Sequence, residues 1–214
     1  EQLPSTIELA LAAMGVAIGV GGALGTIAAL KQGTWVDTLV TSLSVVGVSL
    51  PIYWSALLLI WLLSIRLGWF PATGQGGLAH LLMPALVLGF VSSGVIARLV
   101  RASLLEVLTQ DFMITARAKG LGEGALLLRH ALKNALIPVI TVIGLQFGFL
   151  LSGTVVTETI FSRQGIGRLL VQAILWKDFP LVQGIVLLTA LVYTVMNLTV
   201  DIIYAFLDPR IRYD

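Results

Sequence analysis

Asp201 is the first residue of this sequence that could do chemistry. It lies inside a long apolar stretch, with Asn197 one helical turn earlier. A carboxylate is costly to bury in hydrocarbon, so such a residue is a candidate for proton transfer by default. The alternative, which we favour, places Asp201 near the end of the stretch, where water or Arg210 satisfies its charge.

Glu158 is the second candidate. It lies near the end of another apolar stretch and is followed by Arg163 and Arg168. Two hypotheses fit this pattern equally well: an ion pair that shapes an outer gate or a docking surface for a substrate-binding protein, or an acid in a solvated loop. Used together, Glu158 and Asp201 would suit a proton-coupled secondary transporter, which we keep as an alternative function.

No arrangement typical of an enzyme is found. The sequence has no cysteine, and His80 and His130 are 50 residues apart, on opposite sides of the membrane in the layout given below, so we expect no metal site. No phosphate-binding loop, His-Glu-x-x-His motif or Ser-His-Asp set is present. We therefore expect no catalytic residue and no cofactor bound by this chain, which counts against an intramembrane enzyme.

The composition excludes a water-soluble domain. Of the 214 residues, 57% are hydrophobic and only 11% are charged, and the mean hydropathy is +0.99. Soluble domains carry about 25% charged residues. The apolar residues also form stretches of the length that a helix needs to cross a bilayer. We expect one all-α transmembrane domain over residues 1–214, with five spans at about residues 7–30, 40–63, 81–99, 136–156 and 181–206.

Basic residues predict the orientation of these spans, because loops rich in Lys and Arg stay in the cytoplasm. One side receives nine, namely Lys31, Arg98, Arg101, Arg117, Lys119, Arg129, Lys133, Arg210 and Arg212. The other side receives four, namely Arg66, Arg163, Arg168 and Lys177. We expect the first side and the tail Leu207–Asp214 to be cytoplasmic. Glycines at four-residue spacing are expected to let helices pack closely; the pairs are Gly15 and Gly19, Gly21 and Gly25, and Gly144 and Gly148.

The segment between the third and fourth spans is the most charged part of the chain. It covers about residues 100–137 and reads RASLLEVLTQDFMITARAKGLGEGALLLRHALKNALI. Its apolar residues recur at helical spacing on both sides of the glycines at 120, 122 and 124, which indicates two helices joined by a bend. Such an element could dock another protein. Equally, it could lie on anionic lipid.

The motifs DFMITARAKGLGEGALLLRHALKNALIP, VTETIFSRQGIGRLL, DFPLVQG and NLTVDIIYAFLDPRIRYD together resemble the permeases of ABC importers, in particular the dipeptide, oligopeptide and nickel subgroup. The resemblance covers essentially the whole chain. Two departures are visible. The Glu-Ala-Ala after which the family loop is named is replaced by Thr115-Ala116-Arg117, and Arg163-Gln164 stands where relatives often have Trp-Pro.

The resemblance implies a bundle of the type I ABC importer permease kind, which has six spans, so we expect its first span to be missing from this chain. It also implies that residues 116–121 form a coupling helix in a groove of a cytoplasmic ATPase, and that Pro138 starts the fourth span. The residues expected to couple to the ATPase are Asp111, Phe112, Thr115, Ala116, Arg117, Ala118, Lys119, Gly120 and Leu121.

The function implied by the resemblance is that of a non-catalytic permease in the bacterial or archaeal inner membrane. It would pair with a second homologous permease subunit and with two cytoplasmic ATPases, which bind ATP and Mg. An extracytoplasmic binding protein would deliver the substrate. Relatives carry peptides, nickel chelates, glutathione and similar solutes, and this implies import of one of these, most simply of peptides. Nucleic acid is not an expected partner.

Overall fold

The protein is described by a computed structural model of residues 2–207, with side chains described for residues 2–200 and 202. The described residues form helices and no strands, which confirms the all-α prediction. In chain order the helices are α1 (Leu3–Leu30), α2 (Trp35–Ser49), α3 (Ile52–Leu59), the π-helical η1 (Ile60–Arg66), α4 (Gly77–Leu108), α5 (Asp111–Ala118), α6 (Glu123–Ala125), the π-helical η2 (Leu126–Ala131), α7 (Leu132–Ile160), α8 (Ile166–Leu175) and α9 (Phe179–Leu207).

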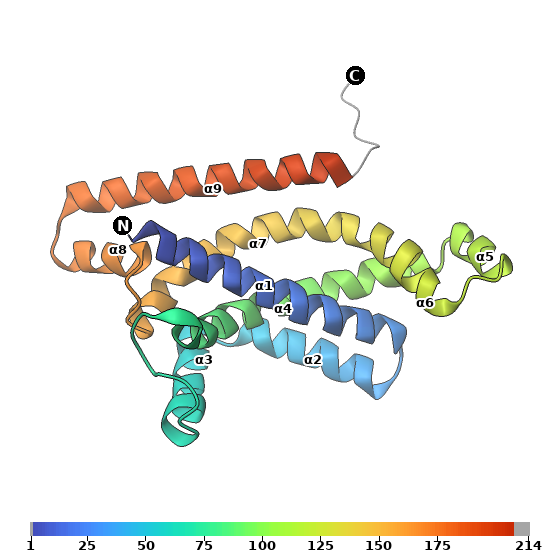
Figure 1. The fold of residues 1–214 in the computed structure, drawn as a ribbon, viewed down its shortest axis with the longest axis horizontal. Coiled ribbons are helices and arrows are strands. Elements are labelled where there is room, and N and C mark those ends of the chain that lie inside the picture. The colour runs from blue at the N-terminus through green and yellow to red at the C-terminus, as the bar shows by residue number, and fades with distance from the viewer. Residues whose placement is uncertain (1, 208–214) are drawn as a thin grey trace.

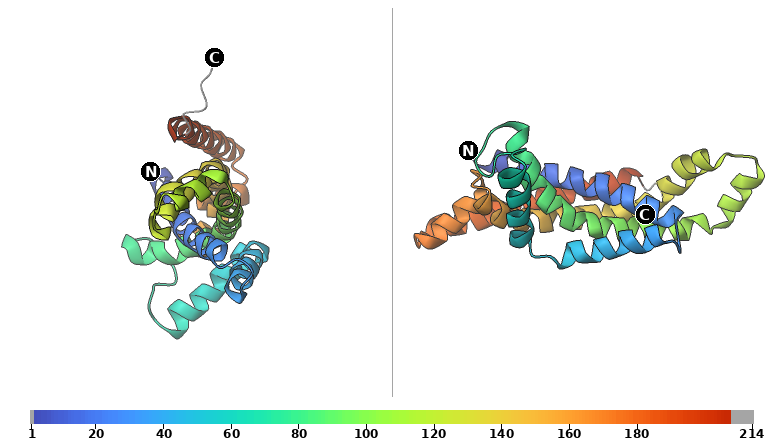
Figure 2. Two further views of the ribbon diagram at one scale, coloured as in Figure 1. Left: turned by 90° about the vertical axis from the view of Figure 1, so that its right-hand side faces the viewer. Right: turned by 90° about the horizontal axis from the view of Figure 1, so that it is seen from below.

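The long helices run along one axis of an elongated bundle (Figures 1 and 2). Helices α1, α2, α4 and α7 lie side by side, α9 follows the outside of α7, and α3 leaves the bundle steeply. Helices α5 and α6 protrude at one end, which we call the loop end (residues 104–131). The first turns of α1, the start of α4 and helix α8 lie at the other end, which we call the junction end (residues 2–8, 70–80 and 158–175).

Four of these helices are long and apolar enough to cross a membrane: α1, α4, the continuous helix from Glu123 to Ile160, and α9 over Phe179–Val200. A fifth crossing is possible if α2 and α3–η1 are counted as one broken span. The structure therefore agrees with a multi-span bundle of four or five crossings. Its helices extend beyond the predicted spans, most of all at the loop end.

The expected span over residues 40–63 is two helices bent by 106° at a break between Ser49 and Ile52. Proline disfavours helical geometry in the residue before it. Leu50 accordingly has an extended backbone with ψ 130°, and Pro51, the N-cap of the next helix, is extended as well, with ψ 134°. We call residues 49–52 the elbow. The sequence contained this signal, but the continuous apolar pattern concealed it.

The expectation that Pro138 starts the fourth span is wrong, because Pro138 lies inside α7. The continuous helix begins 15 residues earlier, at Glu123. Its first turns are held by apolar packing: Ala131 and Ala135 are buried against the end of α4, in contact with Leu104 and Val107. Tertiary packing therefore extends the helix well before the apolar stretch that the sequence suggested.

Helices α1 and α4 form the closest pair in the bundle because glycines remove side chains from their contact. A Cβ added to Gly21 would lie 2.7 Å from the carbonyl oxygen of Ser93, and one added to Gly89 would lie 2.6 Å from that of Ala13. A Cβ on Gly25 would meet the carbonyl oxygen of Ala97. Small residues allow helix backbones to approach in this way in membranes. Of the three predicted glycine pairs, Gly21 and Gly25 thus pack against α4.

The other two glycine pairs differ from each other. Gly144 and Gly148 of α7 receive the side chains of Val200 and Tyr193, which hold α9 against α7. Gly15 and Gly19 of α1 instead face open space, with no atom within 4 Å of an added Cβ. Equal spacing in the sequence therefore corresponds to a helix contact in two cases and to an uncovered face in the third.

This difference gives a matched test of α1–α4 packing. Gly25→Ala is expected to destabilise the protein by about 1–3 kcal/mol, because the added methyl group forces two backbones apart. Gly19→Ala places the same methyl group in open space on the same helix, and is expected to be neutral or to gain up to about 1 kcal/mol from helix propensity. Thermal unfolding of the two purified variants in detergent measures both. Equal unfolding temperatures would contradict the packing.

Candidate functional site

The first candidate site is helix α5, which stands clear of the bundle at the loop end (Figures 1 and 2). The expected coupling helix at residues 116–121 is wrong in register, because the helix observed there covers Asp111–Ala118. Gly120 has φ +78°, a left-handed conformation that ends helices and is easiest for glycine. Lys119 is the C-terminal cap, and Leu121 follows the turn. Gly120 therefore ends α5 and begins the turn to α6, which confirms the predicted bend between two helices.

Met113 fixes α5 to the rest of the protein. Its side chain is fully buried in an apolar cluster built from five elements, together with Leu104 and Val107 of α4, Leu126 of η2, Ala29 of α1 and Ala135 of α7. A buried methionine makes many contacts that would be lost if the helix moved alone. Helix α5 is therefore attached to the bundle through this cluster, chiefly by its contact with η2.

The outer side of α5 is exposed and partly apolar. Phe112 and Ile114, on either side of the buried Met113, are 38% and 59% exposed. Arg117 pairs with Glu123 at 3.1 Å, across the turn that follows α5, and so braces the loop. Of the nine predicted coupling residues, all but the half-buried Ala116 are exposed. An exposed apolar surface with basic neighbours on a rigid mount suits contact with another protein.

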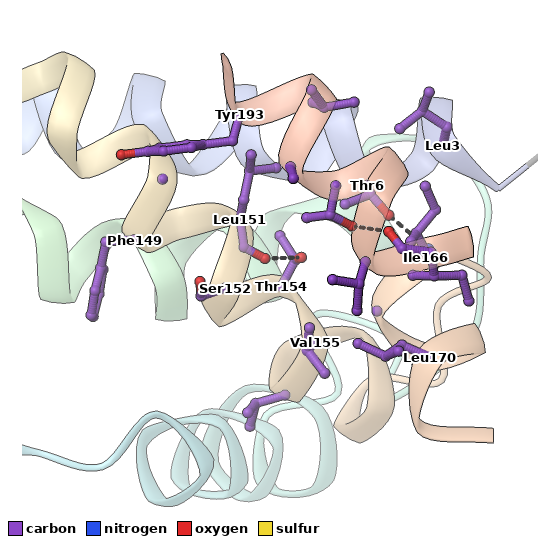
Figure 3. Close-up of a pocket in the computed structure, with 18 residues that line it drawn as sticks. Leu3, Thr6, Phe149, Leu151, Ser152, Thr154, Val155, Ile166, Leu170 and Tyr193 are labelled. Atoms are coloured by element: carbon purple, nitrogen blue, oxygen red, sulfur yellow. Dashed lines mark hydrogen bonds between the residues drawn. The ribbon is translucent and has the colours of Figure 1, made fainter. Parts of the chain in front are cut away.

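The second candidate site surrounds Glu158 at the junction end. Glu158 is fully buried, so the hypothesis of a solvated loop acid is wrong. Thr6 of α1 donates its hydroxyl to Oε1 of Glu158 at 2.6 Å, and the backbone N–H of Arg168 donates to Oε2 at 3.2 Å. Thr6 also accepts the backbone N–H of Ile166 at 2.9 Å (Figure 3). Thr6 and Glu158 together thus cap the first turn of α8.

Glycines make room for this carboxylate. A Cβ on Gly165 would collide with the carboxyl group of Glu158, and one on Gly167 would lie 3.0 Å from Oε2. Gly165, at the N-cap of α8, has no side chain that could cap the helix itself. Free N–H groups at a helix N-terminus attract negative charge. The acid from α7 therefore takes the role that a local capping side chain usually has.

Arg163 is buried beside Glu158 but pairs with another acid. Its side chain is 2% exposed, and Nη2 lies 3.1 Å from Oε2 of Glu8. The same group reaches the hydroxyl of Ser5, and Nη1 reaches the backbone carbonyl of His80, both at 3.4 Å. The hypothesis of an ion pair at Glu158 is therefore wrong: Arg163 pairs with Glu8 of α1 and bonds α4, while Glu158 bonds α1 and the backbone of α8.

Sequence reasoning missed the partners of both residues. Thr6 is 152 residues from Glu158, and Glu8 is 155 residues from Arg163. An acid at position 8, in the first turns of an apolar stretch, was the only signal of this kind. These contacts join the first helix to the segment after the fourth predicted span, and so close the bundle at the junction end.

Asn197, another predicted residue, lies far from Glu158. Asn197 is half-buried on α9, whose first residue, Phe179, is at the junction end. At a rise of about 1.5 Å per residue, Asn197 is roughly 27 Å along that helix. The side chain of Asp201, Arg210, Arg212 and the tail after Leu207 lie outside the described residues. The structure thus does not bring Asn197 and Glu158 together.

An apolar cavity of about 730 Å³ lies between α7 and α9 and reaches Thr6 and Ile166 at the junction end (Figure 3). Its polar lining consists of hydroxyl groups, including those of Thr154 and Tyr193, and no charged residue lines it.

His80 and His130 lie at opposite ends of the bundle, and within residues 2–200 no group of three His, Asp or Glu side chains could hold a metal ion.

The capping role of Glu158 has a measurable consequence. Glu158→Ala leaves buried N–H groups of α8 unpaired and removes a charge near Arg163, so we expect a loss of about 3 kcal/mol or more. Thr6→Val keeps the size of the side chain and should cost about 1–3 kcal/mol. The exposed Glu106 provides a control, and Glu106→Ala should stay within about 0.5 kcal/mol. Thermal unfolding, with limited proteolysis after Phe161, distinguishes these variants; Glu158→Ala as stable as the control would refute the role.

Comparison with known proteins places this geometry in a family. The model of the binding-protein-dependent transport system inner membrane component matches residues 21–213. The dipeptide transport system permease protein of Alkalihalophilus pseudofirmus is 42% identical over 99% of this chain and 72% of its own length. A di/tripeptide transport system permease protein of Pseudomonas aeruginosa is 45% identical over 98% of this chain and 71% of its own.

The fold is found in a solved structure as well. An inward-facing structure of the MetNI methionine ABC transporter superimposes with a TM-score of 0.80, over 97% of this chain and 94% of that one, at 16% identity. At this identity the likeness shows the fold alone. The family match extends from the middle of α1 through α9, and includes the loop end and all of the junction end except residues 2–8. The chain therefore belongs to the family of binding-protein-dependent transport system inner membrane components, as a multi-pass permease subunit of the ABC importer type.

Proposed function

We propose that this permease moves short peptides through the membrane in an ATP-driven importer, and that α5 is its contact with a cytoplasmic ATPase. The observation that carries the coupling role is the mounting of α5: an exposed helix whose buried Met113 joins it to α1, α4 and η2. A helix that hung on flexible loops would absorb a push from a partner. A helix held in an apolar cluster passes the push on.

The residues of the loop end have distinct roles in this proposal. Phe112 and Ile114 provide the apolar contact with a groove of the ATPase, and Lys119 adds a positive charge beside it. Arg117, through its pair with Glu123, keeps the turn after α5 in shape. ATP and Mg are bound by the ATPase subunits, and this chain supplies no catalytic group. Nucleotide then acts by favouring one of two conformations of the complex.

The proposed assembly consists of this chain, a second homologous permease, two cytoplasmic ATPases and an extracytoplasmic binding protein. The family description names a binding protein as part of such systems. The excess of Lys and Arg at the loop end supports a cytoplasmic position for that end. Since α9 runs from the junction end toward the loop end, the C-terminus would be cytoplasmic as well.

Peptides are the proposed substrates because the similar permeases are named for them. Two are named for dipeptide and di/tripeptide transport, and a relative from Escherichia coli that is 44% identical over 208 residues is named for glutathione, itself a small peptide. The alternative of a proton-coupled secondary transporter loses support. Its two acids were Glu158 and Asp201, and Glu158 is engaged in capping α8.

A crosslinking experiment tests the coupling role. Because this chain has no cysteine, a single introduced cysteine is its only thiol. In the assembled transporter, Lys119→Cys is expected to crosslink to an ATPase subunit, because Lys119 lies at the exposed end of α5. Leu175→Cys, 73% exposed at the junction end, is the control and should form none. Mass spectrometry of the adducts identifies the partner. Absence of an ATPase adduct at Lys119 and at Ile114, in a transporting complex, would refute the proposal.

The substrate is tested separately with the complete transporter in lipid nanodiscs. Di- and tripeptides, added with the binding protein, are expected to raise the rate of ATP hydrolysis by about fivefold or more, in the range typical of coupling between sites. Free amino acids at the same concentration serve as the control. Stimulation by a nickel chelate and by no peptide would keep the permease role and overturn the peptide assignment.

A further inference from the structure

An ion pair that the sequence analysis did not consider joins α2 to α4 near the loop end. Arg101 of α4 donates Nε to Oδ1 of Asp37 at 2.5 Å and Nη2 to Oδ2 at 2.7 Å. The Asp37 side chain is 9% exposed and that of Arg101 is 29% exposed. Such a two-pronged pair fixes both the distance and the orientation of its partners.

Asp37 also holds the turn that connects α1 to α2. The backbone N–H of Gly33 donates to Oδ2 at 3.1 Å, and Gly33 has φ +74°, which glycine adopts most easily. Both carboxylate oxygens are thereby engaged. One side chain thus connects the α1–α2 turn, the first turn of α2 and the end of α4.

Arg101 lies on the same stretch of α4 that carries α5. Leu104, less than one turn later, and Val107 form the cluster that buries Met113. The distance along α4 from Arg101 to Leu104 is about 4.5 Å at the helical rise per residue. Any displacement of α5 that moves the end of α4 therefore acts directly on Arg101 and, through it, on Asp37.

Helix α2 leads from this pair to the elbow. Farther along, α2 touches α4 through a glycine on each side: a Cβ on Gly94 would lie 2.6 Å from the carbonyl oxygen of Ser44, and one on Gly47 would lie 3.0 Å from Phe90. Glycine contacts of this kind let α2 and α4 pack closely, but they do little to fix the position of α2 along the axis of α4. Among residues 2–200, Asp37 and Arg101 form the only ion pair between α2 and α4.

We propose that Asp37 and Arg101 are positioning residues that make α2 move together with α4, so that a displacement of α5 reaches the elbow and moves α3 and η1. The pair supplies the register that glycine contacts lack. The proposal rests on the coupling role of α5 proposed above. It assigns to α2 the transmission of the conformational change to the part of the bundle where the chain turns by 106°.

The test uses the complete transporter with Asp37→Asn, Arg101→Lys and the exchange Asp37→Arg with Arg101→Asp. Arg101→Lys keeps the positive charge but loses the two-pronged geometry, so it shows the effect of the geometry without leaving Asp37 unpaired. It also replaces Asp37→Asn in the test if that variant fails to fold. The exposed Arg98, one turn earlier on α4, provides the control variant Arg98→Gln. The primary readout is peptide uptake per ATP hydrolysed.

A direct readout of register comes from spin labels at the exposed positions Val48 of α2 and Glu106 of α4, with and without a non-hydrolysable ATP analogue. In the unmodified pair we expect one narrow distance distribution that keeps its width when nucleotide binds. Asp37→Asn and Arg101→Lys should broaden it and lower uptake per ATP by about fivefold or more. The exchange should restore both, and Arg98→Gln should change neither.

The results separate this proposal from the one on which it rests. If the variants Asp37→Asn and Arg101→Lys broaden the spin-label distance distribution while the Lys119 adduct still forms, the proposal that the ion pair fixes α2 on α4 is supported. The proposal for Asp37 and Arg101 is refuted if the adduct is intact but both Asp37→Asn and Arg101→Lys behave like the unmodified protein. This means that the width of the distance distribution and the uptake per ATP stay within twofold of the unmodified values. Absence of an ATPase adduct at both Lys119 and Ile114 refutes the coupling role, and the spin-label distance then decides alone whether the pair fixes α2 on α4.

Discussion

A bilayer offers no hydrogen-bond partners, so polar groups of this chain must find each other within the protein. In their midsections, α1 and α4 pack through glycines and alanines, which bring the two helix backbones together, as at Gly21, Gly25 and Gly89. Charged side chains that bond between helices gather near the two ends. The closely packed middle makes the ends behave as parts of one body, and everything inferred about coupling depends on that.

The two ends use different physics. The loop end is held by apolar packing around Met113, which leaves the outer side of α5 free for a partner. The junction end is held by a polar network, in which Glu158 caps α8 and Arg163 binds Glu8. An apolar mount tolerates small rotations, whereas a network of short hydrogen bonds to a buried charge does not. The pair of Asp37 and Arg101 combines both properties, because it lies next to the apolar mount and fixes a geometry.

Hydropathy was sufficient to predict a helical membrane bundle, because long apolar stretches have few other uses. Local signals were weaker where packing decides. The glycine bend between two helices was predicted correctly, but the coupling helix was placed at residues 116–121, although Gly120 ends the helix that begins at Asp111. Pro138 was read as a start, although burial of Ala131 and Ala135 extends α7 backward. The partners of Glu158 and the pair of Asp37 and Arg101 join distant segments, and a single sequence carries no sign of such contacts.

The contact between Thr6 and Glu158 also constrains how the protein is made. The two residues are 152 positions apart, so the ribosome has to add all of the chain between them before the bond can form. At bacterial synthesis rates this takes on the order of 10 s. During that time the first helix resides in the membrane or the insertion machinery with its hydroxyl and the nearby Glu8 lacking their final partners. The end of α1 can be locked only after α7 is inserted, which makes closure of the junction end a late step of biogenesis.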